Sequence, residues 1–154
     1  MKSNVGRWLI EHDAETTRQC FAQRPIGTGC DCSECRNFIA ALDHAFPPSF
    51  RALADTFGID LAKPAELCHW CREPSGLHLT AGWFHFVGSI LSGSDALQHS
   101  GTRGTFHLEQ FAPDFELGFS SHLALVPDSF SAHSVTQLEF QTRVPWVIAD
   151  SEVA

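Results

Sequence analysis

The sequence predicts an α+β fold with an N-terminal β-hairpin, two consecutive helices, and then a mainly antiparallel β-sheet that carries the helices on one side. Three observations support this order. Apolar residues recur at helical spacing in two consecutive segments before residue 58, apolar and polar residues alternate in later segments, and no alternating β and α units occur. Helices that are separate from an antiparallel sheet are typical of α+β domains. Because the chain has 154 residues and no linker or repeat, we expect one globular domain over residues 1–154.

The N-terminal hairpin is predicted from two short segments. Residues 5–11 carry Trp8 and Ile10 and favour a strand. The polar residues 12–17 are expected to form a turn, and residues 18–23 the second strand of the hairpin. A Pro-Ile-Gly-Thr-Gly loop then leads to the cysteines.

Two consecutive helices are predicted from apolar spacing and from proline. Residues 34–46 have apolar side chains at helical spacing. Pro47 and Pro48 end this helix and begin a second one, because proline fits the first turn of a helix and not its interior. Gly58 suits the left-handed position that ends the second helix. The apolar faces are formed by Phe38, Ala41, Leu42, Ala45 and Phe46, and by Phe50, Leu53, Ala54 and Phe57.

The remainder of the chain is predicted to be β structure. A Pro-Ser-Gly turn signal separates strands near residues 65–71 and 77–91. Both faces of the second strand are largely apolar, which predicts a central strand. Residues 115–120 also alternate. Residues 135–144 alternate most clearly, so we expect one face of this strand to be exposed to water, with Pro145 at its end.

Composition and charge argue against some partners. The chain has 18 acidic and 10 basic residues, a formal net charge of −8, and no basic run. Nucleic acid binding needs clusters of lysine and arginine, so we predict no nucleic acid partner. An acidic surface serves solubility or attracts a basic protein partner.

The apolar stretches predict a cytoplasmic protein with no membrane partner. Residues 8–10 form too short a stretch for a signal peptide, and residues 81–91 are too few to cross a bilayer. In the reducing cytoplasm, the six cysteines are expected to be thiols or metal ligands rather than disulfides.

A cysteine cluster, Cys30, Cys32 and Cys35, is the most chemically suggestive feature of the sequence. The two-residue gap between Cys32 and Cys35 lets both thiolates face one ion. The pair Cys68 and Cys71 has the same gap. Two such pairs would supply the tetrahedral sulfur shell that zinc prefers. We therefore predict a candidate zinc site at these five cysteines and no other cofactor.

The spacing of the cysteines leaves a second interpretation open. The two pairs are separated by 32 residues, whereas zinc ribbons use about 15–20. His69 is a further donor that could replace a sulfur. The alternative to a metal site is a set of buried free thiols, because cysteine is among the most buried residue types.

Enzyme chemistry has less support in the sequence. A thioredoxin-like use of Cys32 and Cys35 needs a βαβ context, which is absent. The neighbouring Asp31 and Glu34 also oppose a thiolate. Neither a Gly-x-Ser-x-Gly elbow nor a His-Glu-x-x-His motif occurs, so we predict no catalytic residues.

His85 is the histidine that lies on an apolar face, between Trp83 and Val87. We expect a core histidine with one hydrogen-bond partner. The alternative is a pocket residue that acts together with His78 or His107.

Three segments resemble a known group of proteins. They are Cys-Asp-Cys-Ser-Glu-Cys-Arg-Asn-Phe at 30–38, Phe-Gly-Ile-Asp-Leu-Ala-Lys-Pro-Ala-Glu-Leu at 57–67, and Gly-Trp-Phe-His-Phe-Val-Gly at 82–88. Over residues 8 to about 148 the chain resembles a group of small uncharacterised bacterial proteins, for which no activity is established. The Cys-x-Cys-x-x-Cys and Gly-Trp-Phe-His-Phe stretches are the recurrent parts. The resemblance does not include Cys71, which favours a site centred on Cys30, Cys32 and Cys35.

Three functional hypotheses follow, in order of support. The first is a small protein that binds a structural metal ion through a thiolate cluster. The second is an acidic protein-interaction module, similar to an immunity protein or an antitoxin, that binds a basic partner and no metal. The third is an enzyme that uses cysteine and histidine.

Overall fold

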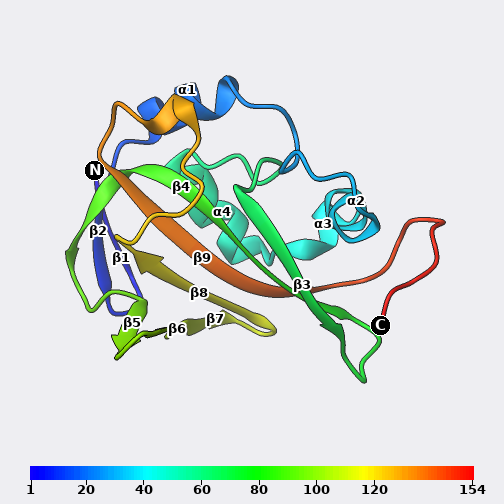
Figure 1. Ribbon diagram of the computed structural model, residues 1–154. Helices are drawn as coiled ribbons and strands as arrows, with labels where there is room; N and C mark the ends of the chain where they lie inside the picture. The colour runs from blue at the N-terminus through cyan, green and yellow to red at the C-terminus, as the bar shows by residue number, and fades with distance from the viewer.

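A curved sheet of seven strands is the framework of the computed structural model, which describes residues 1–154 (Figure 1). The fold class is α+β, as predicted. None of the helices has both the length and the apolarity needed to cross a membrane. The helices are α1 (Ala14–Ala22), α2 (Ser33–Ala40), α3 (Leu42–Ala45), α4 (Pro48–Phe57) and the short 3₁₀ helix η1 (Asp128–Phe130). The strands are β1 (Lys2–Val5), β2 (Trp8–His12), β3 (Glu66–Arg72), β4 (His78–Ser92), β5 (Leu97–Ser100), β6 (Arg103–Phe106), β7 (Glu109–Ala112), β8 (Phe115–Ser120) and β9 (Val135–Val144).

Strand β4 is the centre of the sheet, as its two apolar faces predicted. One edge of β4 pairs antiparallel with β9 along residues 78–87. The other edge pairs with two strands in succession, β3 along residues 78–83 and β2 along residues 88–92. The order of the sheet is β1-β2-β4-β9-β8-β7, with β3 beside the first half of β4. Strands β5 and β6 form a separate hairpin.

The N-terminal hairpin is present, but it uses other residues than predicted. Strands β1 and β2 pair around a turn at Gly6 and Arg7. Residues 18–23 were predicted to be its second strand, and this was wrong because most of them lie in helix α1. The helix begins there because the side chain of Asp13 accepts a hydrogen bond from the backbone N–H of Thr16 at 3.0 Å. The helix buries three side chains at helical spacing: Thr17, Cys20 and Phe21.

The two predicted helices correspond to α2–α3 and α4. The first is interrupted at Ala41, where φ is −91° and ψ is 12°. The second begins at Pro48 and ends at Phe57, as predicted. Gly58 follows in the left-handed conformation with φ of 77°.

Phenyl rings fill the space between these helices and one face of the sheet, which we call the helix face. Phe46 is central, with ring centroids 5.2 Å from Phe50, 6.0 Å from Phe84 and 5.2 Å from Phe140. Aromatic pairs of this kind contribute about 0.5–1.5 kcal/mol each beyond the area they bury. The absence of tyrosine fits this core, because a phenyl ring brings no hydroxyl group that would need a partner.

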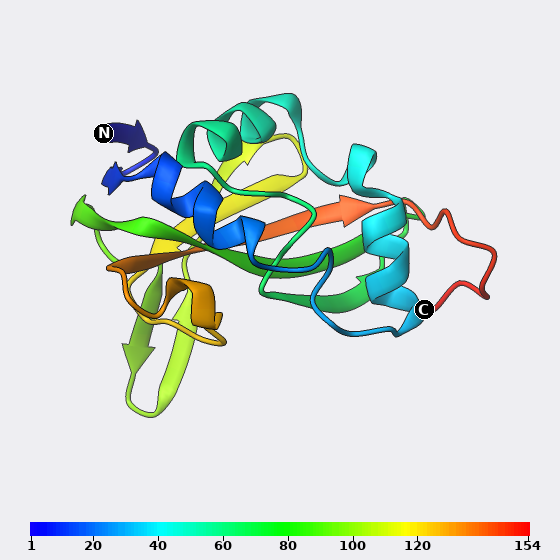
Figure 2. The same ribbon diagram turned by 90° about the horizontal axis from the view of Figure 1, so that it is seen from above.

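The opposite face of the sheet, which we call the loop face, is covered by the loop 121–134 with η1 (Figure 2). The ring of Phe130 lies 6.2 Å from the ring of His85, and the N–H of Ala124 donates to Gln137 at 2.8 Å. We predicted that the polar face of residues 135–144 would be exposed to water. That was wrong for Gln137 and Glu139, which are both buried: the loop covers Gln137, and Glu139 lies beside Phe106 and Leu108 of the β6–β7 segment.

His85, Gln137 and Glu139 form a buried polar row on the loop face. His85 Nε2 donates to Gln137 Oε1 at 3.1 Å, and Gln137 Nε2 donates to Glu139. His85 Nδ1 is buried without a partner. Burial lowers the pKa of His85 to about 4 and raises the pKa of Glu139 to about 7. Folding therefore favours the uncharged form of both side chains.

The contact of Gly58 with α1 generates the first prediction. A Cβ at residue 58 would lie 2.2 Å from the carbonyl oxygen of Ala14, whereas a Cβ at Gly76 would meet only the end of Arg72 at 3.8 Å. Both glycines have positive φ. We expect Gly58→Ala to lower the free energy of unfolding by about 3 kcal/mol and Gly76→Ala by about 1 kcal/mol, because only the first adds a backbone clash to the strain of the left-handed conformation. Urea denaturation measures both, and equal losses would contradict the assigned contact.

The buried row generates a second prediction. Unfolded Glu139 loses its proton near pH 4.5, but the folded carboxyl group keeps it to about pH 7. The contribution of Glu139 to stability is therefore full below pH 4.5 and is lost as the pH rises through 7. Glu139→Gln keeps an acceptor for Gln137 and removes the charge. We expect the variant to gain about 2 kcal/mol over the wild type between pH 5 and pH 8 in urea denaturation.

His85 makes stability rise with pH, opposite to the effect of Glu139, in both the wild type and Glu139→Gln. Its folded pKa of about 4 lies below the ordinary value of 6.5, so its contribution to stability is present above pH 6.5 and is lost as the pH falls toward 4. The difference between wild type and Glu139→Gln isolates the carboxyl group. A difference that does not change with pH would show that Glu139 ionises normally.

Candidate metal centre

Three cysteines lie where the loop before α2 enters that helix. Cys32 is the N-cap residue, with extended backbone (φ −69°, ψ 161°), and Cys35 lies in the first turn. Gly27 and Gly29 have φ of 83° and 90°, which glycine adopts without strain. These two glycines let the loop curl so that Cys30 lies beside the first turn of α2.

The sulfur atoms of Cys30, Cys32 and Cys35 all lie within 4.8 Å of one another. The cysteines are free thiols, with Cys30 and Cys32 exposed and Cys35 buried. Sulfur ligands of one tetrahedral zinc ion are about 3.8 Å apart, given Zn–S bonds of about 2.3 Å. The cluster therefore needs only small side-chain adjustments to hold one ion.

The surroundings of the three thiols differ. The backbone N–H of Cys32 and the two neighbouring thiols donate to Cys30, which lowers the pKa of Cys30. Burial raises the pKa of Cys35, and its hydrogen bonds to Cys32 and Cys30 raise it further. Cys30 is therefore favoured as the first thiolate. A bound cation would supply the charge that Cys35 needs to ionise.

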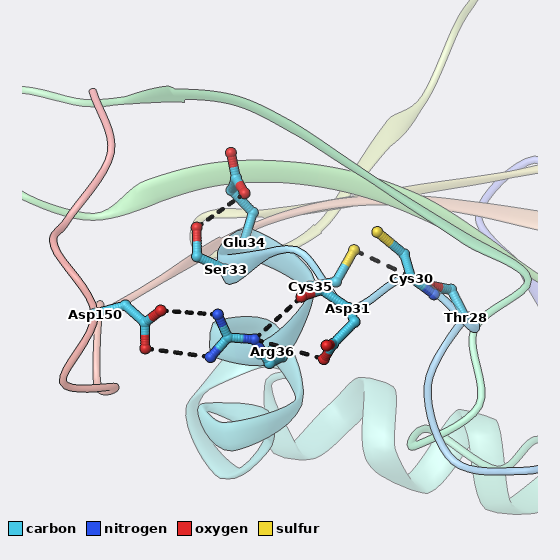
Figure 3. Close-up of polar contacts among 8 residues, drawn as sticks. All are labelled: Thr28, Cys30, Asp31, Ser33, Glu34, Cys35, Arg36 and Asp150. Carbon is cyan, nitrogen blue, oxygen red and sulfur yellow. Dashed lines mark hydrogen bonds and ion pairs between the residues drawn. The ribbon is translucent and has the colours of Figure 1, made fainter.

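Arg36 binds both the cysteine loop and the C-terminal segment. Its guanidinium forms two hydrogen bonds with Asp150, at 3.2 and 2.8 Å, and its Nε donates to the carbonyl oxygen of Asp31 at 3.2 Å. Figure 3 shows the sulfur atoms of Cys30 and Cys35 on one side of the loop and Arg36 on the other. The C-terminal segment and the start of α2 are therefore joined by an ion pair that leaves Cys30 and Cys32 exposed.

A pocket of about 280 Å³ adjoins the cluster on the helix face of the sheet. Cys32 and Cys35 line it together with Glu34, His69 and two residues of the sheet. The Nε2 of His69 lies 2.9 Å from Nδ1 of the buried His78. The Nε2 of His78 in turn lies 2.8 Å from a carboxylate oxygen of Glu152. These contacts orient the ring of His69 and leave its Nδ1 without a protein partner.

Cys68 and Cys71 do not belong to this cluster. They lie opposite Ala81 and Leu79 on β4, whereas His69 lies opposite Thr80. Directly opposed residues of an antiparallel pair project from the same face. A bulge between His69 and Cys71 keeps both cysteines on the loop face. The predicted two-pair shell of four sulfurs is therefore not formed, since the sheet lies between the pairs.

His85 is also separate from the cluster. It is buried on the loop face and hydrogen-bonded to Gln137, as expected of a core histidine. His78 projects from the opposite face, and His107 is exposed.

Two residues that organise the pocket were not assigned to the cysteine site from the sequence: His78, which was considered only as a partner of His85, and Glu152. His78 could have been found from the hairpin, because a turn at residues 74–76 places it near His69 across β3 and β4. Glu152 gave no such signal, since it lies outside any strand or helix and reaches His78 only through the tertiary fold.

Comparison with known proteins adds no assignment. No protein-family model, no curated protein and no solved structure matches the chain. The resemblance to small bacterial proteins therefore stays a prediction, and the functional argument depends on the geometry of the site.

Proposed function

We propose that the protein binds one zinc ion through the thiolates of Cys30, Cys32 and Cys35, and that the ion has a structural role. The observation that carries this proposal is the proximity of three free sulfurs within 4.8 Å at a helix start. Thiolate ligands favour zinc, copper(I) and iron over hard cations. Three cysteines and one further donor make a common structural zinc shell.

The structural role follows from the position of the cluster in the chain. The loop before α2 is held to the rest of the fold by few contacts, among them a hydrogen bond from Gly27 N–H to the carbonyl oxygen of Ala62 at 2.8 Å. Cys30 and Cys32 are exposed, whereas Cys35 is buried against the domain. An ion shared by all three would tie the loop to the helix.

His69 is our choice for the fourth donor. Glu34 and His69 are the other donors that line the adjoining pocket. Zinc-binding histidines usually donate their second ring N–H to another group, which fixes the ring. The contact of His69 Nε2 with His78, continued to Glu152, would serve this purpose and leave Nδ1 for the ion.

Metal content of freshly purified protein tests the proposal. We expect about one equivalent of zinc, and a loss of about 5–10 °C in Tm when a chelator removes it, because a bound ion stabilises only the folded state. Cys30→Ser and Cys32→Ser should lower the zinc content to a small fraction. These two side chains are exposed, so their replacement leaves the apolar core intact.

Matched controls come from the second cysteine pair. Cys68→Ser and Cys71→Ser remove exposed thiols on the other face of the sheet and should retain zinc. Wild-type protein with less than about 0.2 equivalents of zinc, iron and copper would reject the proposal, since a structural ion binds tightly.

Replacement of the fourth donor is a separate prediction. We expect His69→Ala to weaken zinc binding by at least about tenfold in competition with a chelating dye, whereas Glu34→Gln changes it little. The visible spectrum of the cobalt-substituted protein should lose its nitrogen contribution in the same variant. Unchanged affinity and spectrum in His69→Ala would assign the fourth position to another donor.

A further inference from the structure

A second cavity lies on the loop face of the sheet, away from the cysteine cluster. It has a volume of about 310 Å³. Its apolar walls include Trp70, Phe106 and Leu108, and its acidic wall includes Glu116 and Glu139. These residues come from β3, from the β6–β7 segment, and from β8 and β9.

Two aromatic side chains of this cavity, Trp70 and Phe106, are exposed to solvent and do not belong to the hydrophobic core. Trp70 is 64% exposed and Phe106 is 43% exposed, although most aromatic side chains of the chain are buried. Trp70 is the extra residue of the bulge in β3, between His69 and Cys71. Bulges redirect a side chain, and they are common beside functional sites. The bulge therefore places an indole ring at the cavity rim.

Glu139 is the carboxyl group of this cavity that has no cation. It is only 6% exposed, and its one hydrogen bond comes from Gln137. Arg143 instead pairs with Glu116 at 2.8 Å and with Glu73 at 2.9 Å. No lysine, arginine or histidine nitrogen lies within 4 Å of Glu139. A buried carboxyl group without a cation is costly in its charged form.

A cavity that combines an unpaired buried carboxylate with exposed aromatic rings favours a cationic ligand. An anion would be repelled by ionised Glu139, whose charge no cation offsets. A neutral apolar group would cover Glu139 and leave it without a counter-charge. An ammonium or guanidinium group can pair with Glu139 while it packs against the indole of Trp70. The net charge of −8 would also attract a basic partner from a distance.

We propose that this cavity binds the lysine or arginine side chain of a basic protein segment. Glu139 provides the counter-charge at the base of the cavity, and Trp70 and Phe106 hold the aliphatic stem and the charged end. The site is independent of the proposed zinc ion, because it lies on the opposite face of the sheet and shares no residue with the cysteine cluster.

Titration with short peptides tests this proposal in the full-length protein at pH 8, where Glu139 is ionised. The probes are Ac-Ala-Lys-Ala-NH₂ and Ac-Ala-Arg-Ala-NH₂, with the norleucine peptide Ac-Ala-Nle-Ala-NH₂ as the uncharged control. The readout is the indole N–H signal of each tryptophan in ¹H–¹⁵N NMR spectra. We expect saturable shifts of the Trp70 signal with the lysine or arginine peptide, at a Kd on the order of millimolar for a single side chain. The signal of Trp146, on the other face of the sheet, should not move.

Three variants separate the pocket from general charge attraction. Glu139→Gln and Trp70→Leu should each weaken binding at least about fivefold, because one removes the counter-charge and the other removes the ring. In Trp70→Leu the backbone N–H signals of Phe106 and Leu108, which line the same cavity, replace the indole signal as the readout. Glu15→Gln removes the same charge from the exposed surface of α1 and should bind like the wild type. The proposal is overturned if the norleucine peptide binds as well as the charged peptides, if Glu139→Gln binds as the wild type does, or if Glu15→Gln loses as much affinity as Glu139→Gln.

Discussion

The pairing of β4 along its whole length is the interaction on which the rest of the structure depends. Its fifteen residues bind β9 on one edge and β3 and β2 in succession on the other, so three separate parts of the chain are brought to one strand. Because side chains of a strand alternate between two faces, this pairing also sorts every neighbouring residue into one of two layers. The pocket beside the cysteine cluster and the cavity beside Glu139 lie on different faces for this reason.

The two faces of the sheet differ in how they exclude water. On the helix face, phenyl rings from α2, α4 and the sheet pack against one another and against Phe46, which follows α3. The buried side chains of His78 and Thr142 on this face have hydrogen-bond partners. On the loop face, residues 121–134 cover a polar row instead of an apolar one. The loop satisfies Gln137 through a backbone N–H, yet it supplies no cation to Glu139. On the loop face, Glu139 is therefore a buried carboxyl group whose ionisation lowers the stability of the fold.

The candidate metal centre combines local and distant parts of the chain. Cys30, Cys32 and Cys35 come together through the conformation of one short loop and the first turn of α2. The histidine pair behind the pocket comes from the β3–β4 hairpin, and Glu152 comes from the end of the chain. Arg36 binds Asp150 in the same C-terminal segment, so that segment supports both the cysteine loop and His78.

The sequence by itself determined the elements whose signals are local. The α4 helix with its proline start and glycine end, the strands at β3, β4, β8 and β9, and the proximity of Cys30 to Cys35 all depend on residues a few positions apart. It did not determine the structure of residues 14–22, because a turn over residues 12–17 and a strand over residues 18–23 were predicted where Asp13 caps a helix. Only the tertiary structure decided that Cys68 and Cys71 lie across the sheet from the cluster, and that Gln137 and Glu139 are buried. Those outcomes depend on strand register and on the loop that covers Gln137. Both bring together residues that are far apart in the chain, so the local spacing of residue types does not predict them.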